Sequence, residues 1–352
     1  MMKLGNLSVV GLMLVLFGVL ILCLAFSCLI GAVNIPFTDA VRIILNKTLG
    51  IGDVSDIPGP YVTIVWELYA PRAFMGMVVG VGLALCGVVM QAMVQNPLAD
   101  PYILGISSGA SLGATFAFLI GTASLGGFLA TAGVSGLAFI GSMSAAMAVF
   151  ALAAVGGKIT TTKMVLSGVI ISSVCGAFSN LIVYLAPSDS GIRSLTFWLM
   201  GSLGTEGFDS IMLPAVILLV CVVFFLTQMR NLNAMMMGDE TATTLGIDLS
   251  KLRLVYILLT SLLIAVLVCN CGIIGFVGLI IPHIARALVG TNHWKLLPIS
   301  CLLGGIFMVI ADIAARTITT SEIPIGIITA IVGTPIFAYI MIKKSYGFGE
   351  AS

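Results

Sequence analysis

The stretch that decides the fold is Leu68–Leu112, LYAPRAFMGMVVGVGLALCGVVMQAMVQNPLADPYILGISSGASL, in which two charge-free, glycine-rich segments flank a short turn. The segments Ala73–Gln95 and Tyr102–Thr122 contain no Asp, Glu, Lys or Arg, and each is long enough as a helix to cross a hydrocarbon core of about 30 Å. Pro97 and Pro101 lack amide hydrogens and disfavour helical backbone in the residue before them, so the turn continues neither helix. We therefore predict two membrane helices joined at an interface.

The composition places the chain in a membrane rather than in water. Hydrophobic residues make up 60% of its 352 residues, only 8% are charged, and the mean hydropathy is +1.21. So few polar side chains cannot cover a water-soluble globule of this size. The net charge of +1 gives no basic face of the kind that binds nucleic acid, so we expect no nucleic-acid partner.

Charge-free runs of span length recur along the chain and predict an all-α, polytopic membrane protein. In order they are Leu7–Val33, Ala73–Gln95, Tyr102–Thr122, Gly127–Val155, Met164–Ala186, Ser210–Met229, Leu254–Ala285, Leu296–Ala311 and Ile323–Ile342. The run Leu254–Ala285 has 32 residues, about 48 Å as one helix, which exceeds an ordinary crossing. Asn270, Gly272 and Gly275 supply a break within it, so we expect about ten transmembrane helices.

The positive charges predict which way the helices cross. No polar linker divides the chain, so we expect residues 1–352 to form a single membrane domain, with Asn34–Arg72 as an outer loop. An even number of spans puts both termini on one side, and the side richer in Lys and Arg is cytoplasmic. A cytoplasmic amino terminus puts ten such residues inside and five outside. The inner set is Lys3, Lys158, Lys163, Arg230, Lys251, Arg253, Arg286, Lys295, Lys343 and Lys344; the outer set is Arg42, Lys47, Arg72, Arg193 and Arg316.

Glycines at four-residue spacing predict close helix packing. Gly105, Gly109 and Gly113 share one helix face, and Gly76 and Gly80 repeat the pattern. Small residues on one face let a neighbouring backbone approach. We favour this packing role over a pore-lining role.

The predicted spans lack the charges that an ion-driven transporter needs in mid-membrane. The phosphate-binding pattern Gly-x-x-x-x-Gly-Lys-Ser/Thr is also absent, since Gly157-Lys158 is followed by Ile159. A membrane-embedded enzyme would need convergent catalytic groups, and His283 and His293, the only histidines, have no acids nearby in the sequence. ATP is then the obvious energy source, and if ATP drives transport, a separate ATPase subunit must dock from the cytoplasm. An ion-coupled secondary transporter is the alternative.

Several motifs in their order along the chain resemble the FecCD/BtuC-type permease family of ABC importers, which carry iron-siderophores, haem and cobalamin. The likeness runs from about Leu68 to Ile342. Its parts are Pro71-Arg72, Gln91 with the turn Asn96–Pro101, Leu104–Ala110, Gly275–Arg286, Glu322–Gly326 and Gly333–Phe337.

This resemblance implies a type II ABC importer permease fold and a permease subunit that is not an enzyme and has no cofactor. It also implies three kinds of partner: two cytoplasmic ATPase subunits, an extracytoplasmic substrate-binding protein, and a second permease copy or close relative. An iron(III)-siderophore is the cargo we expect first, with haem and cobalamin as alternatives.

The largest inner loop, Arg230–Arg253, contains the expected ATPase contact. Asp239 and Asp248 are candidate helix caps, and a short helix is expected to end before Gly246. Met235–Met237 could fill an apolar groove on the ATPase or equally rest on lipid headgroups. The loop resembles the family's Glu-Ala-Ala-x-x-x-Gly coupling pattern, with Thr241 in place of the first Ala. The implied coupling residues are Gly238, Asp239, Glu240, Ala242 and Gly246; an ordinary surface helix is the alternative.

Two arginines at predicted outer helix ends are candidates for docking the binding protein. Arg316 belongs to Ala311-Asp312-Ile313-Ala314-Ala315-Arg316, which matches the family's Ala-Asp-x-x-Ala-Arg motif, and Asp312 can pair with Arg316 one helical turn away. Arg72 belongs to the family's Arg-x-Pro-Arg motif, but Tyr69 replaces its first arginine. Interfacial snorkelling of Arg72 and Arg316 is the alternative.

The turn Thr160-Thr161-Thr162 lies between two predicted spans, and in the family this turn borders the cytoplasmic mouth of the pathway. These threonines are gate candidates, with a solvated turn as the equally weighted alternative. Cys269 and Cys271 flank the predicted break at Asn270, but two thiolates make an incomplete metal site, so we expect no metal.

Overall fold

The computed structural model describes residues 6–343 apart from 32, 34, 122–126, 158, 187–188, 205–206 and 320, and only the backbone at 6–7, 127–132, 340–341 and 343. The described chain is helical and contains no strand. Its elements are α1 (Asn6–Leu29), α2 (Phe37–Leu49), α3 (Gly59–Thr63), the π-helix η1 (Ile64–Tyr69), α4 (Ala70–Val94), the 3₁₀ helix η2 (Pro101–Leu104), α5 (Ile106–Leu119), α6 (Gly127–Ala154), α7 (Thr161–Leu185), α8 (Asp189–Leu199), α9 (Asp209–Thr227), α10 (Met229–Met236), α11 (Asp239–Thr244), α12 (Leu249–Cys271), α13 (Val277–Val289), α14 (His293–Thr317) and α15 (Ile325–Lys343).

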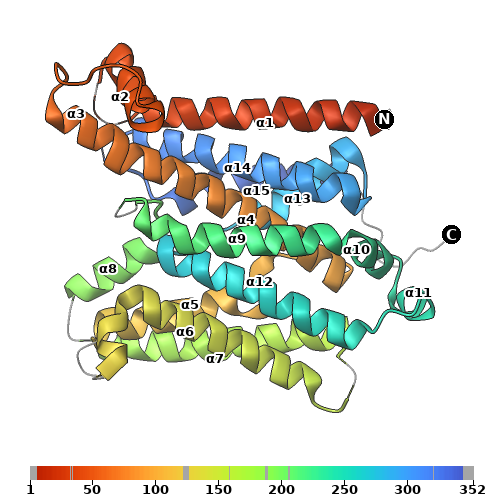
Figure 1. Ribbon diagram of the computed structural model, residues 1–352. Helices are drawn as coiled ribbons and strands as arrows, with labels where there is room; N and C mark the ends of the chain where they lie inside the picture. The colour runs from red at the N-terminus through yellow and green to blue at the C-terminus, as the bar shows by residue number, and fades with distance from the viewer. Residues whose placement is uncertain are drawn as a thin grey trace.

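The long helices form one elongated bundle (Figure 1). Within the described residues, seven helices are long and apolar enough to cross a membrane, and three shorter apolar helices, α5, α13 and α15, accompany them. Together, seven and three match the ten expected spans. Short helices α10 and α11 lie at the end where α1 begins, which we call the α11 end; α2, α3 and α8 lie at the opposite end, the α2 end.

Helix α4 is the centre of the bundle. Almost every residue from Ala70 to Val94 is buried, and α4 packs against α1, α9, α12, α13 and α14. A Cβ atom at Gly80 would clash with the carbonyl oxygen of Gly304 on α14, and one at Gly87 would clash with that of Gly278 on α13. The glycines therefore set how closely these helices cross.

Exposed apolar side chains cover the outer helices. On α1, Leu14 is 68% exposed and Leu22 is 58% exposed, and α7 and α9 expose similar rows. Such a surface is unfavourable in water and suits a lipid environment. The membrane prediction from composition agrees with this arrangement.

The predicted break in the long apolar run is confirmed. Helix α12 ends at Cys271, Gly272 has a φ of 69°, and α13 begins at Val277 after Phe276, whose φ is 70°. The turn after α4 is also confirmed, because Gln95 leaves the helix with a φ of 54°.

Two details of the prediction were wrong. The predicted outer loop Asn34–Arg72 is not simply a loop, because its described residues include α2 and the start of a continuous helix through α3, η1 and α4. Gly105 does not share a helix face with Gly109 and Gly113; its φ of 72° separates η2 from α5. Gly109 and Gly113 do approach a neighbouring backbone, that of α6.

Candidate functional site

The short helix α11 is bounded by two glycines whose backbone only glycine adopts easily. Gly238, before its first residue, has a φ of 105°, and Gly246, after its end, has a φ of 82°. The helix ends before Gly246, as predicted. The turns at these two glycines separate the six-residue helix α11 from α10 before it and from α12 after it.

Asp239 does not cap α11, contrary to the sequence prediction, because Gly238 occupies the cap position. Its carboxylate instead accepts hydrogen bonds from Arg253 at 2.8 and 3.0 Å and from Gln95 Nε2 at 2.6 Å. Asp248 does cap α12, accepting from the Lys251 amide at 3.2 Å. The Asp239 side chain is thus bonded to α12 and to the end of α4, while it stays partly exposed to solvent.

The other α11 residues divide between an inner and an outer face. Ala242 is fully buried, whereas Glu240 is exposed and Leu245 is 64% exposed. Met237 is 67% exposed, but Met235 is completely buried, so the expectation that all three methionines face a partner was wrong. The outer surface of this segment combines one carboxylate with two large apolar side chains.

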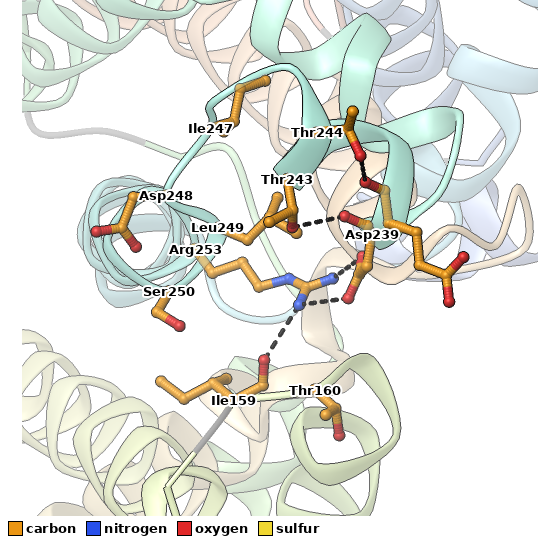
Figure 2. A pocket seen from close by; sticks show the side chains of 11 residues that line it. Ile159, Thr160, Asp239, Thr243, Thr244, Ile247, Asp248, Leu249, Ser250 and Arg253 are labelled. Atoms are coloured by element: carbon orange, nitrogen blue, oxygen red, sulfur yellow. Dashed lines mark hydrogen bonds and ion pairs between the residues drawn. The ribbon is translucent and has the colours of Figure 1, made fainter.

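A recess of about 760 Å³ lies beside α11, between it, the start of α12 and the α6–α7 turn. Figure 2 shows the Arg253 side chain between Asp239 and Ile159 in this recess. The lining residues are Ile159, Thr160, Asp239, Glu240, Thr243, Thr244, Ile247, Asp248, Leu249, Ser250 and Arg253.

One gate candidate, Thr160, lines this recess, and the other two follow it in the chain. Thr160 caps α7 by accepting from the Lys163 amide at 3.4 Å, and Thr162 is exposed. Thr161 accepts a hydrogen bond from Arg253 Nη2 at 3.1 Å. Sequence reasoning missed Arg253. A cation near the amino-terminal end of an apolar helix is unfavourable and calls for an acidic partner, and that signal could have identified it.

The second predicted site lies at the α2 end. Arg72 Nε donates to Asp312 Oδ1 at 2.7 Å, and Arg316 Nε lies 3.0 Å from Asp312 Oδ2, so one buried carboxylate serves both arginines. The predicted Asp312–Arg316 pair is confirmed. Arg316, however, is 1% exposed and donates to the backbone and hydroxyl of Ser27 on α1. It does not reach the surface.

Arg72 has the more accessible position of the two. Its Nη1 donates at 2.6 Å to Glu322, whose side chain is 51% exposed, and a small recess of about 230 Å³ adjoins this pair. Arg72 therefore joins a buried acid on α14 to an exposed acid in the loop before α15.

The eight cysteines, Cys269 and Cys271 included, are free thiols. Among the described residues, no group of three or more His, Cys, Asp or Glu side chains is placed to hold a metal ion.

The model of the FecCD transport family matches residues 19–343. The chain belongs to this family. Its relatives include the cobalamin import permease BtuC of Halobacterium salinarum, 38% identical over 81% of this chain and 75% of that protein, and the hemin transport permease HmuU of Yersinia pestis, 35% identical over 80% of this chain and 84% of that protein.

A solved structure has the same fold as this FecCD-family chain. It is a proposed metal-chelate type ABC transporter in an inward-facing conformation, with a TM-score of 0.79 and 30% identity, and the match covers 95% of this chain and 99% of the other. The chain is therefore a permease of the ABC importer class in a multi-pass membrane fold. It is a transport component and not an enzyme, and the ATPase is a separate subunit.

Proposed function

We propose that this FecCD-family permease carries an iron(III)-siderophore or a similar metal chelate across the cytoplasmic membrane. Haem and cobalamin are the alternative cargoes in the same class. The names of the hemin and cobalamin relatives support a metal chelate, as does the metal-chelate type of the solved neighbour. The working importer would contain two permease copies or close relatives, two ATPases and an extracytoplasmic binding protein.

The α11 end would face the cytoplasm, with both termini there. The excess of Lys and Arg in the segments assigned to this side supports that orientation. The observation that carries the assignment is the geometry of α11, which presents Glu240, Met237 and Leu245 outward while Asp239 and Ala242 hold it to the permease. A short helix anchored on one face and exposed on the other is suited to transmit motion from a docked ATPase.

The α2 end would receive the binding protein. Docking through an acidic residue now rests on Arg72, because its guanidinium already reaches the exposed Glu322, whereas Arg316 is 1% exposed and donates to Ser27. Asp312 and Arg316 would fix the position of the Arg72 guanidinium, and an incoming carboxylate would replace Glu322 as its second partner. Thr160, Thr161 and Thr162 would border the cytoplasmic gate.

The coupling assignment is tested with the whole importer in proteoliposomes. Glu240→Ala with Gly246→Leu should leave the permease folded and reduce uptake about tenfold or more, because hydrolysis no longer moves α11. Gly207→Leu with Asp209→Ala is the matched control: it changes a positive-φ glycine and an exposed first-turn acid at the α2 end. Equal uptake by the two double variants would contradict the assignment.

The cargo is tested on the binding protein. A ferric siderophore, haem and cobalamin would each be titrated against it, and the same three compounds would be offered to the reconstituted importer. We expect the siderophore to bind most tightly and to be accumulated. Tight binding and uptake of haem or cobalamin alone would select that alternative.

A further inference from the structure

Arg253 joins α11 and α12 to the α6–α7 turn, which lies 92–94 residues earlier in the sequence. It stands on the second turn of α12 and is 1% exposed. Its Nη1 donates to the Ile159 carbonyl at 3.1 Å and to Asp239 Oδ2 at 3.0 Å; its Nη2 donates to Thr161 Oγ1 at 3.1 Å and to Asp239 Oδ1 at 2.8 Å. One guanidinium thus holds α11 and the α6–α7 turn together (Figure 2).

The contact between Arg253 and Asp239 is geometrically demanding. Two parallel hydrogen bonds between a guanidinium and a carboxylate fix both orientation and distance, unlike a single ion pair. The Arg253 side chain is buried and the Asp239 side chain is 42% exposed, so the strength of the contact comes from its paired geometry. The two remaining bonds to residues 159 and 161 use the same planar group, so movement of Asp239 must move or break them.

Gln95 adds a fourth element to this cluster. Its side chain donates to Asp239 Oδ1 at 2.6 Å, and its φ of 54° is one of only two positive values among the described non-glycine residues. Left-handed backbone of this kind commonly ends a helix, and here it ends α4. Gln95 ends α4 and starts the Asn96–Pro101 turn, so Asp239 also contacts the end of the central helix.

The remaining polar side-chain bonds of α11 stay within the helix. Thr243 donates to the Asp239 carbonyl at 2.7 Å, and Thr244 donates to the Glu240 carbonyl at 2.9 Å. These bonds stiffen α11 but connect it to nothing else. Among the described residues, Asp239 is the α11 side chain that hydrogen-bonds to α4 and α12.

We propose that the Asp239–Arg253 pair is the rigid linkage that carries displacement of α11 to the α6–α7 turn and to the end of α4. Arg253 is a positioning residue in this account: it touches no cargo and acts through Thr161, Ile159 and Asp239. The inference rests on the proposed coupling role of α11 and adds the residues through which that role operates. Without the pair, an attached ATPase would still hydrolyse ATP but would move α11 without moving the turn.

The test uses the complete importer in proteoliposomes with three single variants. Asp239→Asn keeps the size of a partly exposed side chain and removes its charge. Arg253→Lys keeps the charge but cannot donate in a planar fork. Asp248→Asn is the matched control, because Asp248 lies in the same recess and loses the same charge, but its bonds to Lys251 and Ser250 stay within its own helix.

The first readout is cargo transported per ATP hydrolysed. Asp239→Asn should lower this ratio about tenfold while ATPase association and hydrolysis stay near the unmodified level, since a charge-assisted bidentate pair contributes roughly that factor to an equilibrium. The ratio for Arg253→Lys should lie between that of Asp239→Asn and that of the unmodified importer. The ratio for Asp248→Asn should match the unmodified importer. A merely structural role would reduce the amount of folded importer and leave the ratio unchanged.

The second readout is a distance between spin labels at Val155→Cys, exposed in the α6–α7 turn, and Thr244→Cys, exposed on α11. In the unmodified background this distance should be the same with and without trapped ATP, because the two segments move together. In the Asp239→Asn background it should change with nucleotide. A ratio and a distance unaltered by Asp239→Asn would overturn the linkage while leaving the coupling helix intact. Failure of the ATPase to bind the unmodified permease would overturn both proposals.

Discussion

Arg316 and Tyr69 form a cation–π contact at the α2 end, with the guanidinium carbon 4.8 Å from the centroid of the ring. The contact gives a physical reason for the tyrosine at a position where the family's Arg-x-Pro-Arg motif has its first arginine. A cation at position 69 would face Arg316, which already shares Asp312 with Arg72. The tyrosine instead supplies a neutral ring and accepts a hydrogen bond from the Val33 amide at 3.2 Å.

Restoring the motif by Tyr69→Arg should therefore destabilise this protein. An unpaired cation buried against Arg316 should cost about 3 kcal/mol or more. Tyr69→Phe keeps the ring and loses only the hydroxyl bond, so it should cost about 1 kcal/mol. Thermal unfolding of the two variants in detergent measures the difference, and equal losses would contradict the role given to the ring.

Asp312→Asn should be more damaging than most single changes in this chain. Arg72 and Arg316 would be left as buried cations without their shared carboxylate, at a cost of about 3–5 kcal/mol. Asp56→Asn is the control, because it breaks an ion pair with Arg42 that is exposed to solvent. Denaturation midpoints should fall clearly for the first variant and hardly at all for the second. Similar midpoints would show that Asp312 is not the centre of the cluster.

Glu322→Gln should strengthen attachment of the binding protein. The Glu322 carboxylate pairs with the Arg72 guanidinium in this structure. Removing the negative charge of Glu322 frees that guanidinium for an external carboxylate. The pair is partly exposed, so the gain should be no more than about fivefold in Kd. Arg72→Glu should have the opposite effect and make binding less sensitive to salt. Both effects are measured by titrating each permease variant with the binding protein at two salt concentrations. Unchanged affinities in both variants would contradict docking through Arg72.

Gly80→Ala should disturb the crossing of α4 and α14. The added methyl would meet the Gly304 carbonyl, so the helices must separate, at a cost of about 1–3 kcal/mol. Gly18→Ala on α1 is the matched change, because nothing lies within 4 Å of a Cβ there. The yield of folded protein and its melting temperature should drop for Gly80→Ala alone. A similar drop for both would point to the loss of glycine itself rather than to the close approach.

The fold was largely predictable because the membrane imposes a simple rule on the sequence. Apolar runs of fixed length must become helices, so charge-free segments located the spans, and Gly272 located the break between α12 and α13. The short segments were harder. Helix α2 has a mixed composition that includes Asp39, Arg42 and Lys47, so no charge-free run located it. The structure shows that it packs through the buried residues Ala40 and Ile43.

The candidate sites were predicted only as positions along the chain. Which face of α11 points inward depends on Arg253 and Gln95, and neither lies within that helix. In the same way, Arg316 looked accessible because it ends a span, yet Ser27 on α1 and Tyr69 enclose it. Contacts between residues so distant in the chain are decided by packing, which local patterns do not report.

The central claim is that this permease transports only when a separate ATPase acts on it from the α11 end. The most direct measurement is accumulation of a radiolabelled ferric siderophore in proteoliposomes that contain the permease with or without its ATPase and binding protein. We predict accumulation against a concentration gradient only when both partners and ATP are present. Accumulation by the permease alone, driven by an imposed ion gradient, would contradict the account.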